Sequence, residues 1–168
     1  MHTNGDEAVL EIETLLDRKE YSAALEASSS AIKHFPDRAE LYYHRAQARV
    51  LTDPRSPDYC GAIEDVAEAS RLNPDEPAFR FFSGLWCFEI GNWLEAAEGL
   101  AEALQLEEAL GSTYYASSAR LLRALALQQL GDRNGAVREA SFIPSGTSFY
   151  ARSRLWTGSD IVGADRDH

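Results

Sequence analysis

The sequence contains little cysteine and no long apolar run. Its two cysteines, Cys60 and Cys87, do not form a CxxC motif, which favours free thiols in a reducing compartment over a disulfide framework. Residues 79–90 form the longest strongly apolar stretch, but Arg80 and Glu89 make it too charged, and it is too short, to span a bilayer. The first residues are acidic and precede no apolar segment, unlike a secretory signal. We therefore predict a cytoplasmic protein that does not enter a membrane.

Basic residues are also scarce, because 27 acids oppose 16 lysines and arginines and give a formal charge of −11. The net charge is −13 over residues 1–119 and +2 over residues 120–168. An acidic surface repels phosphate backbones, so we predict that the chain does not bind nucleic acid. Arg45 and Arg49 lie one helical turn apart, and we expect them to pair with nearby acids rather than with phosphate.

Motifs that carry catalysis or hold a cofactor are missing as well. The sequence has no HExxH, GxSxG, P-loop or GxGxxG, and none of its four histidines has a partner at metal-ligand spacing. Acid pairs such as Glu64 with Asp65 are adjacent on a predicted helix and point in different directions, so they do not form a general acid/base couple. We predict that the chain is not an enzyme and has no catalytic residues, no metal and no cofactor.

An internal repeat is the strongest positive signal. Similar stretches begin at Lys19, Pro57, Gly91 and Gly131, and each places an alanine at the same offset. These alanines are 38, 34 and 40 residues apart, which indicates a period of 34 residues with two loop insertions. A second alanine follows seven residues later in the first three stretches, on the same helix face, where a small side chain lets two helices approach closely. The two sets are Ala24, Ala62, Ala96 and Ala136, and Ala31, Ala69 and Ala103.

Proline and glycine punctuate the same repeat. Pro36 and Pro74 stand 38 residues apart and are expected to follow the second helix of a pair, since proline cannot continue a helix. Gly91 and Gly131 fit the turn between paired helices, where the chain adopts a left-handed conformation. Two pairs have the spacing of capping boxes, Asn92 with Glu95 and Asp37 with Glu40.

These features resemble the tetratricopeptide repeat (TPR) family, most clearly over residues 79–107, where Gly84, Gly91, Trp93, Ala96 and Ala103 occupy signature positions. The resemblance implies an all-α, right-handed αα-hairpin solenoid of about four TPR-like repeats with a C-terminal capping helix or tail. We expect one domain, 1–168, with repeats at about 5–38, 39–76, 77–110 and 117–146 and a tail at 147–168. The sequence departs from the signature at the first-helix tryptophan, replaced by Ala8, Tyr42, Arg80 and Arg120, and at the leucine three residues later, replaced by Glu11, Arg45, Ser83 and Arg123.

The resemblance also implies that the first helix of each repeat lines a concave groove. Its expected partner is a protein or peptide with apolar and basic character, an amphipathic helix or an extended segment, although a stripe of phenylalanines at helical spacing is also typical of helix–helix core. A clamp for a C-terminal carboxylate is excluded, because Val9, Glu13, His44, Ala78 and Phe82 stand where lysine, asparagine and arginine would be needed. The predicted partner-binding residues are Glu13, Glu40, Tyr43, Gln47, Phe81, Leu85, Phe88, Leu121 and Leu125.

The tail differs from the rest of the chain in being cationic and aromatic. Between residues 147 and 159 it offers Phe149, Tyr150, Leu155 and Trp156 together with Arg152 and Arg154. It could form a capping helix that shields the last repeat, as terminal repeats in solenoids require, or it could lie in the groove and compete with a partner. We expect residues 161–168 to be disordered.

These observations favour a protein-interaction module, an adaptor or scaffold that holds a partner segment. Two versions of a dedicated binder remain open. The length, acidity and apolar groove are similar to those of the TPR chaperones of bacterial type III secretion translocators, and a toxin-neutralising immunity protein is equally compatible because an acidic binder can cover a basic toxin. The sequence sets neither the partner nor the oligomeric state.

Overall fold

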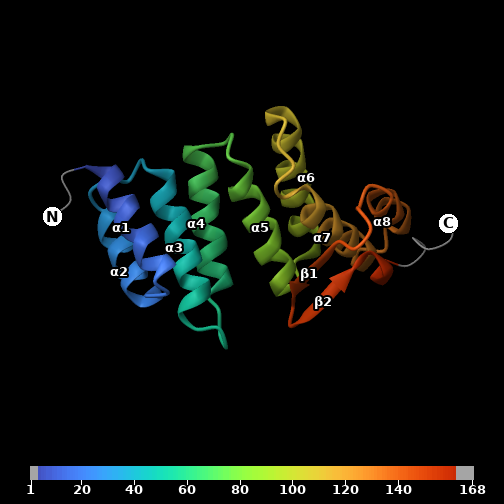
Figure 1. Cartoon of the computed structure of the whole chain (residues 1–168), viewed down its shortest axis with the longest axis horizontal. Helices are drawn as coiled ribbons and strands as arrows, with labels where there is room; N and C mark the ends of the chain where they lie inside the picture. The colour runs from blue at the N-terminus through green and yellow to red at the C-terminus, as the bar shows by residue number, and fades with distance from the viewer. Residues whose placement is uncertain (1–3, 162–168) are drawn as a thin grey trace. The chain divides into compact units, whose positions relative to one another are not determined.

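The structure is a computed structural model that describes residues 4–161. The chain divides into two compact units, Met1–Asp75 (unit one) and Glu76–His168 (unit two). Both units are built from two helical hairpins (Figure 1). Unit one contains α1 Gly5–Asp17, α2 Tyr21–Ile32, α3 Ala39–Thr52 and α4 Tyr59–Leu72. Unit two contains α5 Pro77–Ile90, α6 Trp93–Leu110, α7 Ala116–Gln129, α8 Arg133–Ala140, β1 Ser148–Ala151, β2 Arg154–Thr157 and the 3-10 turn η1 Gly158–Asp160.

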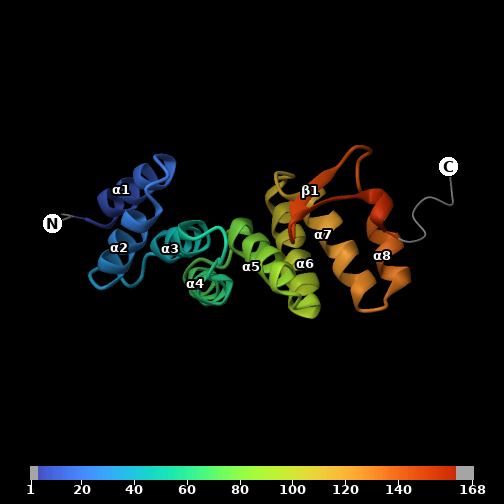
Figure 2. The ribbon, with the colours of Figure 1, turned by 90° about the horizontal axis from the view of Figure 1, so that it is seen from below.

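The tail forms a β-hairpin, so the expectation of a capping helix is wrong. β1 and β2 pair antiparallel from Ser148 opposite Thr157 to Ala151 opposite Arg154, and β1 lies against α7 (Figures 1 and 2). The segment is rich in aromatic residues, and burial alternates along β1 between exposed Ser148 and Tyr150 and covered Phe149 and Ala151, as in a strand with one packed face. Ile161 is buried, contrary to the expected disorder, and residues 162–168 lie outside the described part of the chain.

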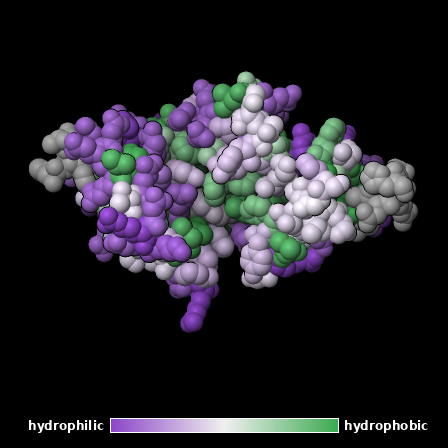
Figure 3. Space-filling model, viewed as in Figure 1, coloured by the Kyte–Doolittle hydropathy of each residue, from purple (hydrophilic) through white to green (hydrophobic). Residues whose placement is uncertain are grey.

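The two units differ in polarity on the face that Figure 3 shows. Hydrophilic residues cover most of unit one in the view of Figure 3, whereas apolar residues gather over α5 and α7 in unit two. Among the residues that the structure describes, no helix has the length and apolarity needed to cross a membrane.

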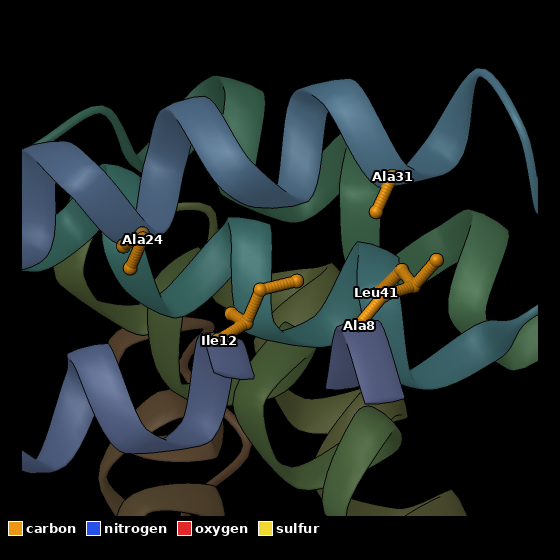
Figure 4. Close-up of a cluster of buried hydrophobic side chains, with 6 residues drawn as sticks. Ala8, Ile12, Ala24, Ala31 and Leu41 are labelled. Atoms are coloured by element: carbon orange, nitrogen blue, oxygen red, sulfur yellow. The ribbon is translucent and has the colours of Figure 1, made fainter. Parts of the chain in front are cut away.

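The repeated alanines form the contacts between paired helices. All seven are buried, with at most 3% of the residue surface exposed. In unit one Ala24 and Ala31 of α2 meet Ala8 and Ile12 of α1 and Leu41 of α3 in one apolar cluster (Figure 4). Because an alanine keeps two helix backbones close, this pattern explains the 34-residue period in physical terms. The predicted architecture of helix-hairpin repeats is confirmed.

Helices α5 and α6 approach each other closely at Gly84. A Cβ atom added at Gly84 would lie 2.7 Å from Cγ of Leu100, 2.9 Å from its backbone nitrogen and 3.1 Å from the carbonyl oxygen of Ala96. Backbone atoms of a helix cannot move aside as the end of a side chain can, so only glycine fits at this position.

Substituting Gly84→Ala should therefore lower the free energy of unfolding of unit two by about 2 kcal/mol, the usual cost of overpacking. Urea unfolding followed by tryptophan fluorescence measures this unit alone, because all three tryptophans lie between residues 86 and 156. Gly158→Ala is the matched control, since a Cβ there meets nothing within 4 Å. Equal stabilities of the two variants would contradict the close crossing.

Helix ends follow the predicted turns but not the predicted capping boxes. Gly91 and Gly131 have φ angles of +80° and +84°, as the turn between paired helices requires. The capping-box predictions are wrong. Asp37 lies one residue before Arg38, the N-cap of α3, and Asn92 is the N-cap of α6 but its side chain accepts no capping hydrogen bond from that helix. Side-chain caps of second helices occur instead at Asp58 and Asp132, which accept from the backbone N–H three residues later, both at 2.9 Å.

Ion pairs replace apolar packing between some paired helices. In unit one Arg45 and Arg49 of α3 both bind Asp65 of α4, and each Nε lies 2.9 Å from Oδ2. In unit two Arg120 and Arg123 of α7 both bind Glu139 of α8. Arg45, Arg120 and Arg123 stand at positions where the TPR signature has tryptophan or leucine. The expectation that Arg45 and Arg49 pair with nearby acids is confirmed, and the cost of burying each guanidinium is offset by a carboxylate from the facing helix.

The two cysteines lie in different environments and are both free thiols. Cys60 is exposed, whereas burial of Cys87 in α5 raises the pKa of its thiol to about 11. At pH 8 only about one Cys87 side chain in a thousand is then a thiolate, the reactive form. We predict that a thiol reagent labels one cysteine per folded chain at pH 8 and two in denaturant, as counted by mass spectrometry. Labelling of both in the folded chain would contradict the packing of α5.

Candidate partner-binding faces

The nine predicted groove residues lie on two separate faces, one in each unit. Each face consists of the first helices of two neighbouring hairpins, which contact each other: α1 with α3 in unit one, and α5 with α7 in unit two. We name them the α1/α3 face and the α5/α7 face. The first holds Glu13, Glu40, Tyr43 and Gln47, and the second holds Phe81, Leu85, Phe88, Leu121 and Leu125.

The α1/α3 face contains an open acidic hollow of about 320 Å³, lined by Glu13, Leu16, Asp17, His44 and Gln47. Gln47 donates through Nε2 to the hydroxyl of Tyr43 at 3.1 Å, so its Oε1 accepts from Nδ1 of His44, also at 3.1 Å. The other ring nitrogen of His44 lies 3.4 Å from the carboxylate of Glu13. Three predicted residues are thus joined through His44. Glu40 does not join them, because its carboxylate faces a neighbouring arginine at 3.6 Å.

The α5/α7 face is aromatic and already covered. Phe81 stacks on Tyr115 with ring centroids 4.5 Å apart, and Phe149 of β1 meets it edge-on at 6.3 Å. Phe88 lies near the C-terminal end of α5, and its ring is edge-on to that of Trp156 in β2, with the centroids 6.0 Å apart. The hairpin therefore brings one ring to Phe81 and another to Phe88, and both of these phenylalanines are buried.

Arg152, at the tip of the hairpin, binds the C-terminal end of α5. Its guanidinium donates to the carbonyl oxygens of Phe88 at 3.1 Å and of Glu89 at 2.6 Å, and its backbone N–H donates to the Glu89 carboxylate at 2.8 Å. The last carbonyls of a helix lack intrahelical donors and carry partial negative charge, and the last turn of α5 has no basic residue of its own. Burial raises the pKa of the Glu89 carboxyl, and the contact with Arg152 opposes that shift.

Residues of the hairpin and of the turn after it also contact α7. Gln128 donates through Nε2 to the carbonyl oxygen of Asp160 at 3.2 Å, and Ala151 and Ile161 are buried. Leu121 and Leu125 are also buried, whereas Leu85 is half-buried. Of the two places considered for the tail, the structure therefore shows it on the α5/α7 face. That a partner binds these residues stays a prediction.

Sequence reasoning missed three contributors to this face. Tyr115 lies in the loop insertion between α6 and α7, where the repeat period gives no register. Glu89 and Trp93 flank the turn after α5, and the Trp93 ring lies 4.9 Å from the Arg152 guanidinium. The sequence did offer one signal: an arginine, Arg152, among the aromatic residues of the tail indicates that the tail docks on a surface with negative charge or partial negative charge. Within residues 4–161, no group of three or more His, Cys, Asp and Glu is arranged to hold a metal ion.

The chain shares part of its sequence with known proteins, although no protein-family profile matches it. It is 29% identical over 85 residues to the human Protein SGT1 homolog, which covers 51% of this chain and 22% of that protein. It is 38% identical over 60 residues to the human Tetratricopeptide repeat protein 16, which covers 36% of this chain and 6% of that protein. The chain thus spans less than a quarter of the length of either curated relative.

Solved structures match more of the chain at lower identity. The MamA protein superposes with a TM-score of 0.70 at 20% identity, over 82% of this chain and 70% of that one. YrrB, described as a TPR protein with an unusual peptide-binding site, gives 0.71 at 17%, over 82% and 66%. The TPR2B domain of yeast Sti1, solved as a pHsp70 complex, gives 0.66 at 23%, over 74% and 97%. The resemblance found in the sequence is therefore confirmed at the level of architecture: this chain has the helix-hairpin fold of the tetratricopeptide repeat proteins.

Proposed function

We propose that the chain is a non-catalytic protein-interaction module whose α1/α3 and α5/α7 faces bind segments of a partner polypeptide. One observation carries the proposal: the α5/α7 face already holds a polypeptide segment, the chain's own hairpin. It does so through aromatic rings and the end of a helix, both of which can recognise a segment from another protein. Two of the structural neighbours support the proposal, since one was solved as a pHsp70 complex and another has a peptide-binding site.

The chemistry of the faces favours a partner with apolar and basic groups. The α5/α7 face offers phenylalanine rings and helix-end carbonyls, and the hollow of the α1/α3 face offers the carboxylates of Glu13 and Asp17. Neither face presents a lysine or arginine at the clamp positions Val9, Glu13, His44, Ala78 and Phe82. A C-terminal carboxylate is therefore not the group that is recognised.

We place the protein in a reducing compartment, the cytoplasm, because Cys60 and Cys87 are free thiols. We also propose that neither nucleic acid nor membrane is a partner, given the formal charge of −11.

An adaptor and a dedicated binder, such as a type III secretion chaperone or an immunity protein, use the same faces. They differ in the number of partners, several for an adaptor and one stoichiometric partner for the others.

Affinity purification of the tagged full chain from its source cells, followed by mass spectrometry, tests the proposal. Leu85→Glu places a charge on the α5/α7 face and should reduce recovery of the partner by about tenfold or more, whereas matched Leu94→Glu, on a half-exposed site of α6, should not. Circular dichroism confirms that both variants are folded. Equal recovery by both variants, or no protein recovered by the wild-type chain, would contradict the proposal.

A further inference from the structure

We propose that the α5/α7 face is a site for an arginine held in a tight turn between two aromatic residues, and that the hairpin is an exchangeable occupant of this site. The inference rests on the proposed function and deepens it. The partner segment it describes presents a guanidinium and two aromatic rings and binds by displacing residues 148–161. The hairpin shows the recognition chemistry because it is the ligand that the site now holds.

The arginine subsite is built from main chain and side chain together. Two carbonyl oxygens at the end of α5 accept from the guanidinium, the Glu89 carboxylate accepts from the backbone N–H of the same residue, and the Trp93 ring faces the cation at 4.9 Å. One guanidinium nitrogen donates both hydrogen bonds to the end of the helix, and the guanidinium carbon lies within cation–π reach of the Trp93 ring. The subsite therefore binds a cationic side chain at the negatively polarised end of α5.

Two aromatic subsites accompany this contact. Phe81 and Tyr115 form one and receive Phe149, while Phe88 and Trp93 form the other and receive Trp156. Displacing the hairpin without replacing its rings would expose Phe81 and Phe88 to water. A displacing segment must therefore bring aromatic groups of its own.

The hairpin depends on docking for its structure. Its two strands have four residues each, and an isolated two-stranded hairpin is marginal in water. Its turn places Arg152 and Ser153 at φ angles of +49° and +59°, a conformation that favours Asn-Gly and is strained for other residues. Tyr150 is 67% exposed and Leu155 is 57% exposed, so two of the hairpin's four large apolar side chains contribute little to docking. The hairpin is therefore not stable enough by itself to resist displacement by a competing segment.

The position of the hairpin also differs from that of a solenoid cap. A cap covers the outer apolar face of the last helix pair. Here Val137 of α8 and Leu130, at the end of α7, stay exposed, while the hairpin covers positions on α5 and α7 that the family resemblance assigns to partner binding. The hairpin follows α8, so it can leave without unfolding any helix.

Binding of a fluorescently labelled synthetic peptide of residues 147–161 to the full-length chain tests the inference. The tethered hairpin acts at an effective concentration of about millimolar, so the wild-type chain should bind the peptide weakly. Arg152→Ala in the chain should tighten peptide binding about tenfold or more, because the peptide still carries the arginine that the chain has lost. Ser153→Gly in the chain, which relieves strain in the turn, should weaken peptide binding below the wild-type level. A peptide that itself carries Arg152→Ala should not show this tighter binding to the Arg152→Ala chain.

A folded Arg152→Ala chain that binds the peptide no better than the wild type would overturn the inference.

A second measurement needs no variant. In the unmodified chain the amide hydrogens that join β1 and β2 should exchange with deuterium at least about tenfold faster than those of α5 and α7, by local opening. Exchange at the same rate would make the hairpin a permanent part of the core and would also overturn it. Either failure leaves the affinity purification unaffected, so the two proposals fail separately.

Discussion

Replacing Asp65 with alanine should lower the free energy of unfolding of unit one by about 3 kcal/mol or more. The side chain of Asp65 is only 6% exposed and receives hydrogen bonds from both Arg45 and Arg49. Without it, two partly buried guanidinium groups lose the carboxylate that offsets the cost of their desolvation. Urea unfolding followed by circular dichroism measures the change.

The matched control for this prediction is Glu68→Ala on the same helix. Glu68 pairs with Arg71, which is 66% exposed, and exposed pairs contribute little to stability. We expect that variant to leave the free energy of unfolding almost unchanged. A loss below about 1 kcal/mol for Asp65→Ala would show that water, and not Asp65, satisfies the two arginines.

Substituting Phe88→Ala should lower the free energy of unfolding of unit two by about 4 kcal/mol. Phe88 is 1% exposed and packs edge-on against Trp93 at 5.2 Å and Trp156 at 6.0 Å, so its removal leaves a cavity between α5, the start of α6 and the hairpin. Tryptophan fluorescence should report the change directly, because two of the three indole rings lose a neighbour.

Tyr150→Ala provides the comparison, since it removes an aromatic ring from the exposed face of the same hairpin. It should cost no more than about 0.5 kcal/mol. Similar losses for the two variants would contradict the assignment of Phe88 to the contact between hairpin and helix.

The sequence predicted the features that repeat and missed those that do not. Ala24 and its equivalents recur because every hairpin has the same close contact between helices, and Gly91 and Gly131 recur because every turn needs the same conformation. The ion pairs carried a readable signal, since Asp65 and Glu139 stand at the same offset after Ala62 and Ala136. That offset places an acid opposite arginines that have replaced the apolar residues of the signature.

The β-hairpin could not be predicted in the same way. A two-stranded sheet of this length is stabilised by the surface on which it docks, and the local sequence does not encode that surface. Its Arg152-Ser153 turn also lacks the Asn-Gly pair that marks most two-residue hairpin loops. Adjacent Phe149 and Tyr150 break the alternation of apolar and polar residues that marks a half-buried strand, and the aromatic and cationic composition is equally typical of an amphipathic helix.

Hydrogen exchange of the full chain, alone and bound to its purified partner, tests the central claim most directly. If the partner takes the place of the hairpin, amide hydrogens of residues 148–157 should lose protection in the complex while α5 and α7 keep or gain it. Unchanged exchange in both segments, or protection that appears only on α2, α4, α6 or α8, would show that the partner binds elsewhere and would contradict the account.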